Sequence, residues 1–205
     1  MLDIALQTTR EESIREWLIA GGTLGAAAVA LILGLLVPWM RARWLRPNLR
    51  IDYEPKEPYC RYTKLVSGQA AHWVRVKITN RGRSGAKGCR GKMIAVLKED
   101  GSVREDRDPM PLKWANMPEG QSLDPLDLAR EEYQFLAVVV ATDDNKEVAT
   151  ICTDPDARPG FPQTLEAGQL HRVRLGAYCD NGEPVTAEFE ITFSGDVHSL
   201  SMRQV

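Results

Sequence analysis

Residues 172–193 read RVRLGAYCDNGEPVTAEFEITF, and their pattern is the strongest indication of the fold in this chain. Apolar and polar side chains alternate in two runs, with the period of two that places every second residue on the same face of a strand. Between the runs lies Asp180-Asn-Gly-Glu-Pro184, and an Asn-Gly pair flanked by alternating runs is typical of a β-hairpin. We therefore predict a hairpin that brings Arg172 and Arg174 opposite or diagonal to Glu188 and Glu190.

Further strands are predicted upstream of this hairpin. Residues 49–53 and 72–79 alternate, and in the second run Val74, Val76 and Ile78 share one face while Arg75, Lys77 and Thr79 share the other. Both runs read as half-buried strands. Residues 93–97 and 135–140 are continuous apolar runs, and the second, FLAVVV, is expected to form a central strand covered on both faces. Residues 123–132 are expected to form one or two helical turns.

The predicted strands indicate an all-β domain over residues 48–205. Seven or eight short strands are expected there, and most of the 12 prolines and 16 glycines of the chain punctuate them. Strands do not alternate with helices, so the pattern predicts two packed antiparallel sheets, with a barrel as the alternative. A length of 205 residues accommodates one such domain and an anchor.

The anchor is predicted from Trp17 to Met40, WLIAGGTLGAAAVALILGLLVPWM, which contains no charged residue. As a helix it would extend roughly 36 Å, enough to cross a hydrocarbon core of roughly 30 Å with some tilt. No face carries the polar stripe of a soluble amphipathic helix. A cleaved signal peptide is excluded because the apolar stretch is too long, an acidic segment precedes it and no small-residue cleavage site follows. Pro38 is expected to kink the last turn.

These predictions divide the chain into four parts. Residues 1–16 form a short N-terminal tail, 17–40 the transmembrane α-helix, 41–47 a basic juxtamembrane linker and 48–205 the β domain. Basic residues resist translocation, and the N-terminal flank carries two arginines whereas the C-terminal flank carries four. The soluble domain is therefore predicted to lie in the cytoplasm, at the plasma or inner membrane. The arginines counted are Arg10 and Arg15 before the helix and Arg41, Arg43, Arg46 and Arg50 after it.

Two kinds of partner follow from these features. The bilayer itself binds residues 17–40, in which a small-residue spacing that permits close helix approach indicates a possible homodimer through Gly21, Gly25, Ala30 and Gly34. The same spacing occurs in monomeric spans, so both readings stay open. With 26 basic and 28 acidic side chains, the chain has no overall positive field to attract nucleic acid.

A resemblance arises in residues 73–97. Here Trp73-Val-Arg-Val-Lys-Ile-Thr-Asn80 alternates and ends in Asn-x-Gly, a turn with small residues follows, and a second apolar run returns to Leu97. This segment resembles the start of prokaryotic CARDB-type immunoglobulin-like β-sandwich modules. Asn80 and Gly82 are expected to adopt positive φ in the turn. The resemblance implies an Ig-like antiparallel β-sandwich used for binding or spacing, without catalysis. Such modules usually lie outside the cell, the opposite of what the arginines predict.

Side chains that commonly carry chemistry are scattered. Cys60, Cys89, Cys152 and Cys179 contain no C-x-x-C pair; they would form thiols in the cytoplasm, and two disulfides are possible if the domain is exported. Cys179 is expected to be a small buried hydrophobe. The histidines are expected to be partly exposed residues at strand ends, namely His72, His171 and His198.

No catalytic, cofactor-binding or metal-binding residue is predicted. The chain lacks G-x-S-x-G, P-loop and H-E-x-x-H motifs. The acidic residues Asp143, Asp144, Asp154 and Asp156, with Asn145, lack the spacing of a calcium loop and are interpreted as solvated turns. We therefore expect a protein that is not an enzyme: a membrane-tethered β-sandwich that binds a protein partner through loops or a sheet edge. The alternative is a structural subunit of a membrane assembly, recognised through its transmembrane helix.

Overall fold

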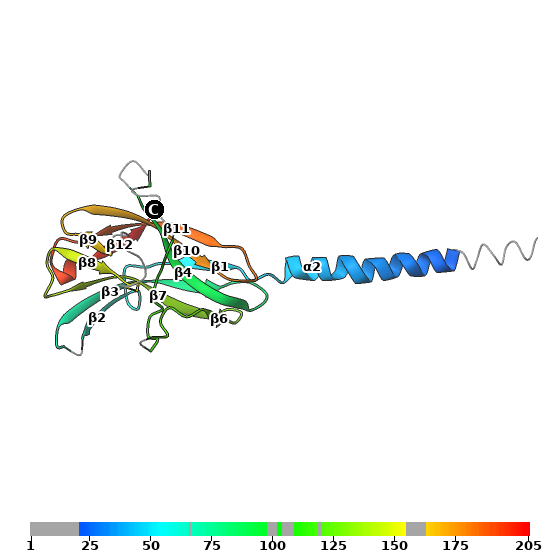
Figure 1. Cartoon of the computed structure of the whole chain (residues 1–205), viewed down its shortest axis with the longest axis horizontal. Coiled ribbons are helices and arrows are strands. Elements are labelled where there is room, and N and C mark those ends of the chain that lie inside the picture. The colour runs from blue at the N-terminus through cyan, green and yellow to red at the C-terminus, as the bar shows by residue number, and fades with distance from the viewer. Residues whose placement is uncertain (1–20, 66, 98–101, 104–108, 119, 155–162) are drawn as a thin grey trace, which may run out of the picture. The chain divides into compact units, whose positions relative to one another are not determined.

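The computed structural model describes residues 21–205, except for residues 66, 98–101, 104–108, 119 and 155–162 (Figure 1). The chain divides into two compact units between Leu45 and Arg46. The first contains a helix and the second contains all the strands that the structure describes.

The helix of the first unit is apolar. It is α-helical over residues 21–31, passes through a π-helical turn, η1 (Ile32–Leu36), and continues as α2 (Val37–Trp44). Its segment Gly21–Met40 is long and apolar enough to cross a membrane, which confirms the predicted N-terminal apolar helix as a candidate span. Residues 1–20, with the predicted tail and the start of the span, lie outside the described residues.

Pro38 lies two residues after the end of the π-helical turn at Leu36. A proline in a helix lacks a backbone N–H, and its ring clashes with the carbonyl oxygen four residues earlier. The wider π turn of η1 precedes Pro38, and the N–H of Val37 donates to Ile32 O, five residues back. The irregularity of the helix therefore lies before the proline. The sequence predicted a kink in the last turn, but the helix continues there as α2 to Trp44.

The second unit is built from two antiparallel sheets (Figure 1). In the first sheet the order is β1-β3-β7-β8-β9, and β2 also pairs with β3. These strands are β1 (Leu49–Asp52), β2 (Cys60–Lys64), β3 (Ala70–Asn80), β7 (Tyr133–Thr142), β8 (Val148–Ile151) and β9 (Thr164–Glu166).

In the second sheet the order is β12-β11-β10-β4-β5, and β6 also pairs with β4. Its strands are β4 (Ala86–Leu97), β5 (Met110–Pro111), β6 (Leu126–Leu128), β10 (Leu170–Tyr178), β11 (Val185–Thr192) and β12 (Ser201–Gln204). A short 3-10 helix, η2 (Val197–Ser199), precedes β12. The predicted all-β sandwich is therefore confirmed and the barrel alternative is not observed. The prediction of helical turns in residues 123–132 is wrong, because Leu126–Leu128 forms a strand that pairs with β4.

The predicted hairpin is confirmed as β10 and β11. Arg172 lies opposite Glu190 and Arg174 opposite Glu188 in its register. The connection spans residues 179–184, and neither Asn181 nor Gly182 is among the described residues with positive φ. It is therefore not the tight turn that an Asn-Gly pair forms with two positive φ angles. The side chain of Asn181 instead binds the start of β4 and the residue before it, donating to Gly85 O and accepting from Lys87 N.

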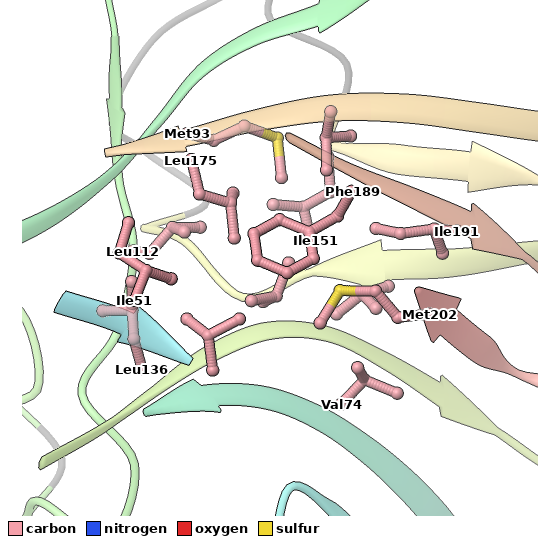
Figure 2. Packing of buried hydrophobic residues seen from close by; sticks show 14 of the residues in the cluster. Ile51, Val74, Met93, Leu112, Leu136, Ile151, Leu175, Phe189, Ile191 and Met202 are labelled. Carbon is pink, nitrogen blue, oxygen red and sulfur yellow. The ribbon is translucent and has the colours of Figure 1, made fainter. Parts of the chain in front are cut away.

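The core lies between the two sheets (Figure 2). Ile51, Val74 and Leu136 from the first sheet face Met93, Leu175 and Phe189 from the second, and all six are at most 5% exposed. The predicted central strand, β7, is buried along residues 135–139. Close contact requires Gly91 in β4, since a Cβ atom there would overlap the side chain of Leu136.

The strand β3 departs from its predicted half-buried character. Val74, Val76 and Ile78 face the core as expected, but Arg75 and Thr79 on the opposite face are also only 6% and 4% exposed. The alternating pattern was correct about which residues share a face. It was wrong about exposure, and Tyr59, Ala115 and Phe135 form a small second cluster of buried side chains outside the main core.

The segment that follows β5 crosses from the second sheet to the first. After β5, Leu112 N donates to Gly91 O of β4. Lys113 N then donates to Cys152 O and Ala115 N to Phe135 O, while Ala137 N donates back to Lys113 O. The segment therefore pairs with the part of β7 that β8 leaves free, and it satisfies backbone groups that would otherwise form an open edge.

We predict that Gly91→Ala destabilises the domain by about 1–3 kcal/mol, because the added methyl group forces the fully buried Leu136 out of its place. The control is Gly85→Ala, where the nearest atom to an added Cβ is Leu128 O at 3.7 Å. Denaturant titration of the full chain in detergent, followed by tryptophan fluorescence, measures both. Equal stabilities for the two variants would contradict the packing of β4 against β7.

Candidate functional site

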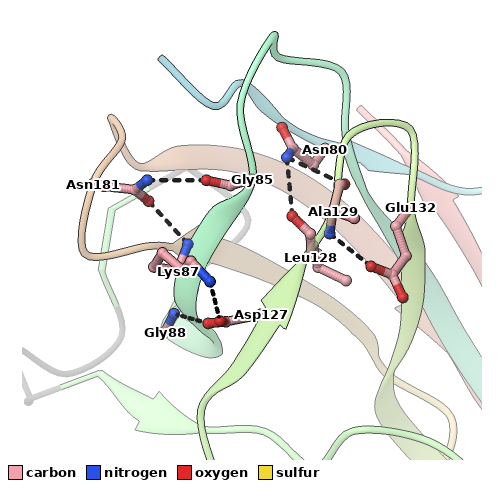
Figure 3. A network of polar contacts seen from close by, with 9 residues as sticks. All are labelled: Asn80, Gly85, Lys87, Gly88, Asp127, Leu128, Ala129, Glu132 and Asn181. Carbon is pink, nitrogen blue, oxygen red and sulfur yellow. Dashed lines mark hydrogen bonds and ion pairs between the residues drawn. The ribbon is translucent and has the colours of Figure 1, made fainter. Parts of the chain in front are cut away.

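The side chain of Asn80, at the end of β3, is a buried hub of hydrogen bonds (Figure 3). Its Oδ1 accepts from Asn48 N at 3.2 Å and Gly82 N at 3.0 Å. Its Nδ2 donates to Ser84 O at 2.8 Å and Leu128 O at 3.1 Å. The amide therefore joins the segment before β1, the β3–β4 connection and the end of β6, using both its donor and its acceptor capacity.

Two glycines hold the lead-in segment, residues 46–48, through which the chain reaches β1. A Cβ on Gly82 would lie 2.6 Å from Arg46 O and 2.5 Å from Pro47 Cα, and a Cβ on Gly182 would lie 2.8 Å from Pro47 Cγ. Pro47 is buried, and it fits there because neither glycine has a side chain. Arg46 Nη1 also pairs with Glu183 Oε1 at 3.1 Å.

These contacts change the expected roles of Asn80 and Gly82. Neither is among the described residues with positive φ, so they do not reverse the chain by adopting a left-handed conformation. Asn80 acts through its side chain and Gly82 through close backbone approach. The β3–β4 connection also crosses between sheets, since β3 belongs to the first and β4 to the second.

A second polar network pins the neighbouring turns to β4 (Figure 3). Asp127 accepts from Lys87 Nζ at 2.6 Å and from Gly88 N at 2.9 Å. Lys87 and the Gly88 N–H lower the pKa of the Asp127 carboxyl below its usual range. Ala129 N donates to Glu132 Oε2, which closes the turn between β6 and β7. Together with Asn80, this network organises the end of the domain where the chain enters it.

A separate feature is the buried guanidinium of Arg75 on the outer face of the first sheet. The residue is 6% exposed, and its Nε has no hydrogen-bond partner among the described residues. Arg75 N donates to Tyr59 O, and Ala137 lies opposite on β7. Burial first, and then the like charge of Arg61, lowers the pKa of the Arg75 guanidinium.

The surroundings of Arg75 are cationic and aromatic. Arg61 of β2 lies opposite Trp73, which is two residues before Arg75 on the same face of β3. On the other side, Ala137 of β7 lies opposite Arg75, and its N–H donates to Lys113 O of the segment after β5. Lys77 makes cation–π contacts, since its Nζ lies 5.2 Å from the ring centre of Tyr133 and 6.0 Å from that of Tyr59. No ion pair in the described part of the chain involves Arg61, Arg75 or Lys113.

A stack of rings lies at the other end of β3. The ring of Tyr62 stacks on His72 at a centroid distance of 4.0 Å and also approaches His198 at 4.8 Å. His72 Nδ1 lies 3.1 Å from Val197 O, and its buried Nε2 has no partner within the described residues. Burial lowers the pKa of His72, so the neutral ring is favoured. The expectation of partly exposed histidines is wrong for His72 and His171, which are each 4% exposed because loops cover these strand ends.

The outer face of the second sheet carries paired charges. Glu190 accepts from Arg172 Nη2 and from Arg203 Nε, each at 2.6 Å, and these bonds lower the pKa of its carboxyl. Arg174 binds Glu188 through two nitrogens. The hairpin pattern predicted that Arg172 and Arg174 meet glutamates of β11. Arg203 reaches Glu190 only because β12 pairs with β11.

All four cysteines are free thiols. Burial raises the pKa of Cys89 and of Cys152 to about 12, so neither is an activated nucleophile. Cys179 was expected to be buried but is only partly buried beside the core, and burial raises the pKa of its thiol also. Cys60 Sγ lies 3.3 Å from the Tyr53 hydroxyl.

The acidic residues after β7 serve the turn to β8. Asn145 Oδ1 accepts from Glu147 N and Val148 N, and Asp144 accepts from Gln69 Nε2 at 2.8 Å. Asp156 lies outside the described residues. Within the residues that are described, no group of three or more His, Cys, Asp or Glu side chains is arranged to hold a metal ion.

Comparison with known proteins adds no relative: no family model matches this chain, and no curated protein matches it significantly.

We predict that Asn80→Ala destabilises the domain by about 2–4 kcal/mol, because it strands buried backbone donors and acceptors on several segments. Asn145→Ala is the matched control, since its amide caps an exposed turn and its loss should cost about 1 kcal/mol or less. Denaturant titration of the full chain in detergent compares them. A cost for Asn80→Ala no larger than for Asn145→Ala would show that Asn80 is not the hub of this end.

Proposed function

We propose that this protein is a single-pass membrane protein that holds a β-sandwich interaction module at the membrane surface and carries no catalytic site. The observation that supports this most strongly is the lead-in segment. The helix that contains the candidate span continues to Trp44, and Arg46 and Pro47 are already held in the domain by Glu183, Gly82 and Gly182. Only Leu45 lies between them in the sequence.

A tether of this kind would present the domain to a binding partner. A long flexible linker lets a domain sample many orientations, whereas a proline locked between glycines restricts the chain at its point of attachment. On this proposal the sheet faces and loops of the domain are offered to a partner. The CARDB-type resemblance, which stays a prediction, implies the same use in binding or spacing.

The alternative is a structural subunit that an assembly recognises through its helix. Gly21, Gly25, Ala30 and Gly34 are exposed, and a Cβ on any of the three glycines would meet no atom within 4 Å. This leaves space for a second helix, as a homodimer or a larger assembly requires.

We further propose that the domain lies on the cytoplasmic side of the plasma or inner membrane. The support is the excess of arginines after the span, Arg41, Arg43, Arg46 and Arg50, over Arg10 and Arg15 before it. Free thiols at all four cysteines agree with a reducing compartment.

Topology reporters test this orientation. With the domain in the cytoplasm, a C-terminal fluorescent protein that matures only inside should be bright, and a C-terminal phosphatase that works only outside should be inactive. The double variant Arg41→Gln/Arg43→Gln equalises the flanks and should raise phosphatase activity, while Arg46 and Arg50 keep their pairs in the domain. An active phosphatase on the unaltered chain would refute a cytoplasmic domain.

A replacement of the span tests the interaction module against the subunit. Native electrophoresis of gently solubilised membranes measures the apparent mass of the complex that the chain forms. Replacing residues 17–40 by an unrelated apolar span of the same orientation should leave that mass unchanged, because the domain makes the contact. Gly21→Leu/Gly25→Leu should also leave it unchanged. Collapse to the mass of the monomer in both variants would instead establish recognition through the helix.

A further inference from the structure

We propose that Cys89 and Cys179 are a redox-sensitive pair that closes into a disulfide when the domain meets an oxidised low-molecular-weight disulfide of the glutathione type. Both are free thiols in the structure. The bond joins β4 to the connection that follows β10, beside the residues that hold the lead-in segment. The observation that carries this proposal is the position of the two cysteines next to each other on neighbouring strands, with both side chains on the same face.

The register of β4 and β10 brings the two cysteines together. Tyr178 lies opposite Arg90, so one further step along both chains places the cysteines beside each other. The chains are still paired beyond this point, since Asp180 N donates to Lys87 O at 2.8 Å. Opposed residues of an antiparallel pair have Cα atoms roughly 4.5–5.5 Å apart. A disulfide joins Cα atoms roughly 4.4–6.8 Å apart, so this backbone spacing already suits the bond.

Both side chains lie on the core side of the second sheet. Gly91 and Ala177 lie opposite each other and face the core. Cys89 is two residues before this glycine and Cys179 is two residues after this alanine, and side chains two apart along a strand share a face. Cys89 is fully buried in the main core, and Cys179 packs against that core. After the larger effect of burial, the nearby thiol of Cys179 also raises the pKa of Cys89.

The other two cysteines are too far apart for such a bond. Cys60 belongs to β2 and Cys152 directly follows β8, both on the first sheet. The strands β3 and β7 lie between β2 and β8, which makes a separation of roughly 14 Å at the spacing of neighbouring strands. Cysteines with Cα atoms more than about 7 Å apart cannot be bridged without moving the backbone. The structure therefore favours one disulfide, within the second sheet.

Cys179 is the thiol that reacts first, because it is partly exposed whereas Cys89 is not. Burial raises the pKa of the Cys179 thiol, and the backbone N–H groups of Asn181 and Gly182 act on it in the opposite direction. Cys179 Sγ loses its proton to solvent and attacks glutathione disulfide, which releases one glutathione thiolate and leaves a mixed disulfide. Cys89 then loses its proton and attacks Cys179 Sγ, releasing the second glutathione. Two protein thiols are oxidised, and one glutathione disulfide is reduced to two thiols.

The bond would strengthen the point at which the lead-in segment is held. Cys179 begins the connection between β10 and β11, in which Gly182 packs against Pro47 and Glu183 pairs with Arg46. A Cβ on Gly182 would lie 2.7 Å from Cys179 Sγ, so the sulfur is next to this contact. Hydrogen bonds and packing hold the connection to β4 in the reduced domain, and the disulfide adds a covalent bond. The rigidity of this point of attachment therefore depends on the redox state of the pair.

The test incubates the full chain in detergent micelles with glutathione buffers that range from fully reduced to fully oxidised. Samples are quenched with acid, their remaining thiols are alkylated, and their peptides are identified by mass spectrometry. The oxidised chain should contain a link between Cys89 and Cys179, while Cys60 and Cys152 should remain thiols. It should also melt about 5–15 °C above the reduced chain, because the bond closes a long loop in the unfolded state.

Alanine variants separate the pair from the mere loss of a buried thiol. Cys89→Ala should abolish both the link and the rise in melting temperature on oxidation, and Cys179→Ala should do the same from a partly buried position. Cys152→Ala is the matched control, since it also removes a buried thiol and should retain both effects. Each variant is compared with itself in the reduced state, so a change in its basal stability does not affect the result.

Several outcomes would overturn the inference. One is that all four thiols of the wild-type chain remain open to alkylation after incubation in fully oxidised glutathione. Others are a bond that uses Cys60 or Cys152, and a rise in melting temperature that persists in Cys89→Ala. Disulfide-linked dimers on non-reducing electrophoresis, without the internal link, would also overturn it, because Cys179 would then react with a second copy of the chain instead of with Cys89.

Discussion

The side-chain amide of Asn80 is the interaction on which the arrangement of this domain depends. It accepts from the segment that leads into β1 and donates to the end of β6, while the backbone of Asn80 pairs with the turn before β7. Only an amide side chain of this length presents an acceptor and two donors at once. Both sheets are linked here, because β1 and β7 belong to the first and β6 pairs with the second.

The hub also accounts for the way the domain is attached. Pro47 lies between Gly82 and Gly182, and the second of these belongs to the β10–β11 connection that Asn181 pins to β4. The point of attachment is thus held by residues far apart in the sequence.

The other constraint is the covering of the first sheet on both faces. The segment after β5 crosses from one sheet to the other, and Tyr59, Ala115 and Phe135 form a small second cluster outside the main core. Arg75 on this face is 6% exposed, and its Nε has no partner among the described residues. Natural proteins rarely retain such a group without a reason. In the second sheet the outer charges are paired across strands, because Glu190 binds Arg172 and Arg203 while Glu188 binds Arg174.

The sequence by itself determined the apolar helix, the strands of the central hairpin and the two-sheet class, since each depends on local periodicity. It also indicated which residues of β3 share a face and that Arg172 and Arg174 meet Glu188 and Glu190. Only the tertiary structure decided that Asn80 bonds through its side chain, that Arg203 joins Glu190, and that Arg75 and His72 are buried. These facts depend on segments that approach from distant parts of the chain, and the alternation within a single strand carries no information about what covers it.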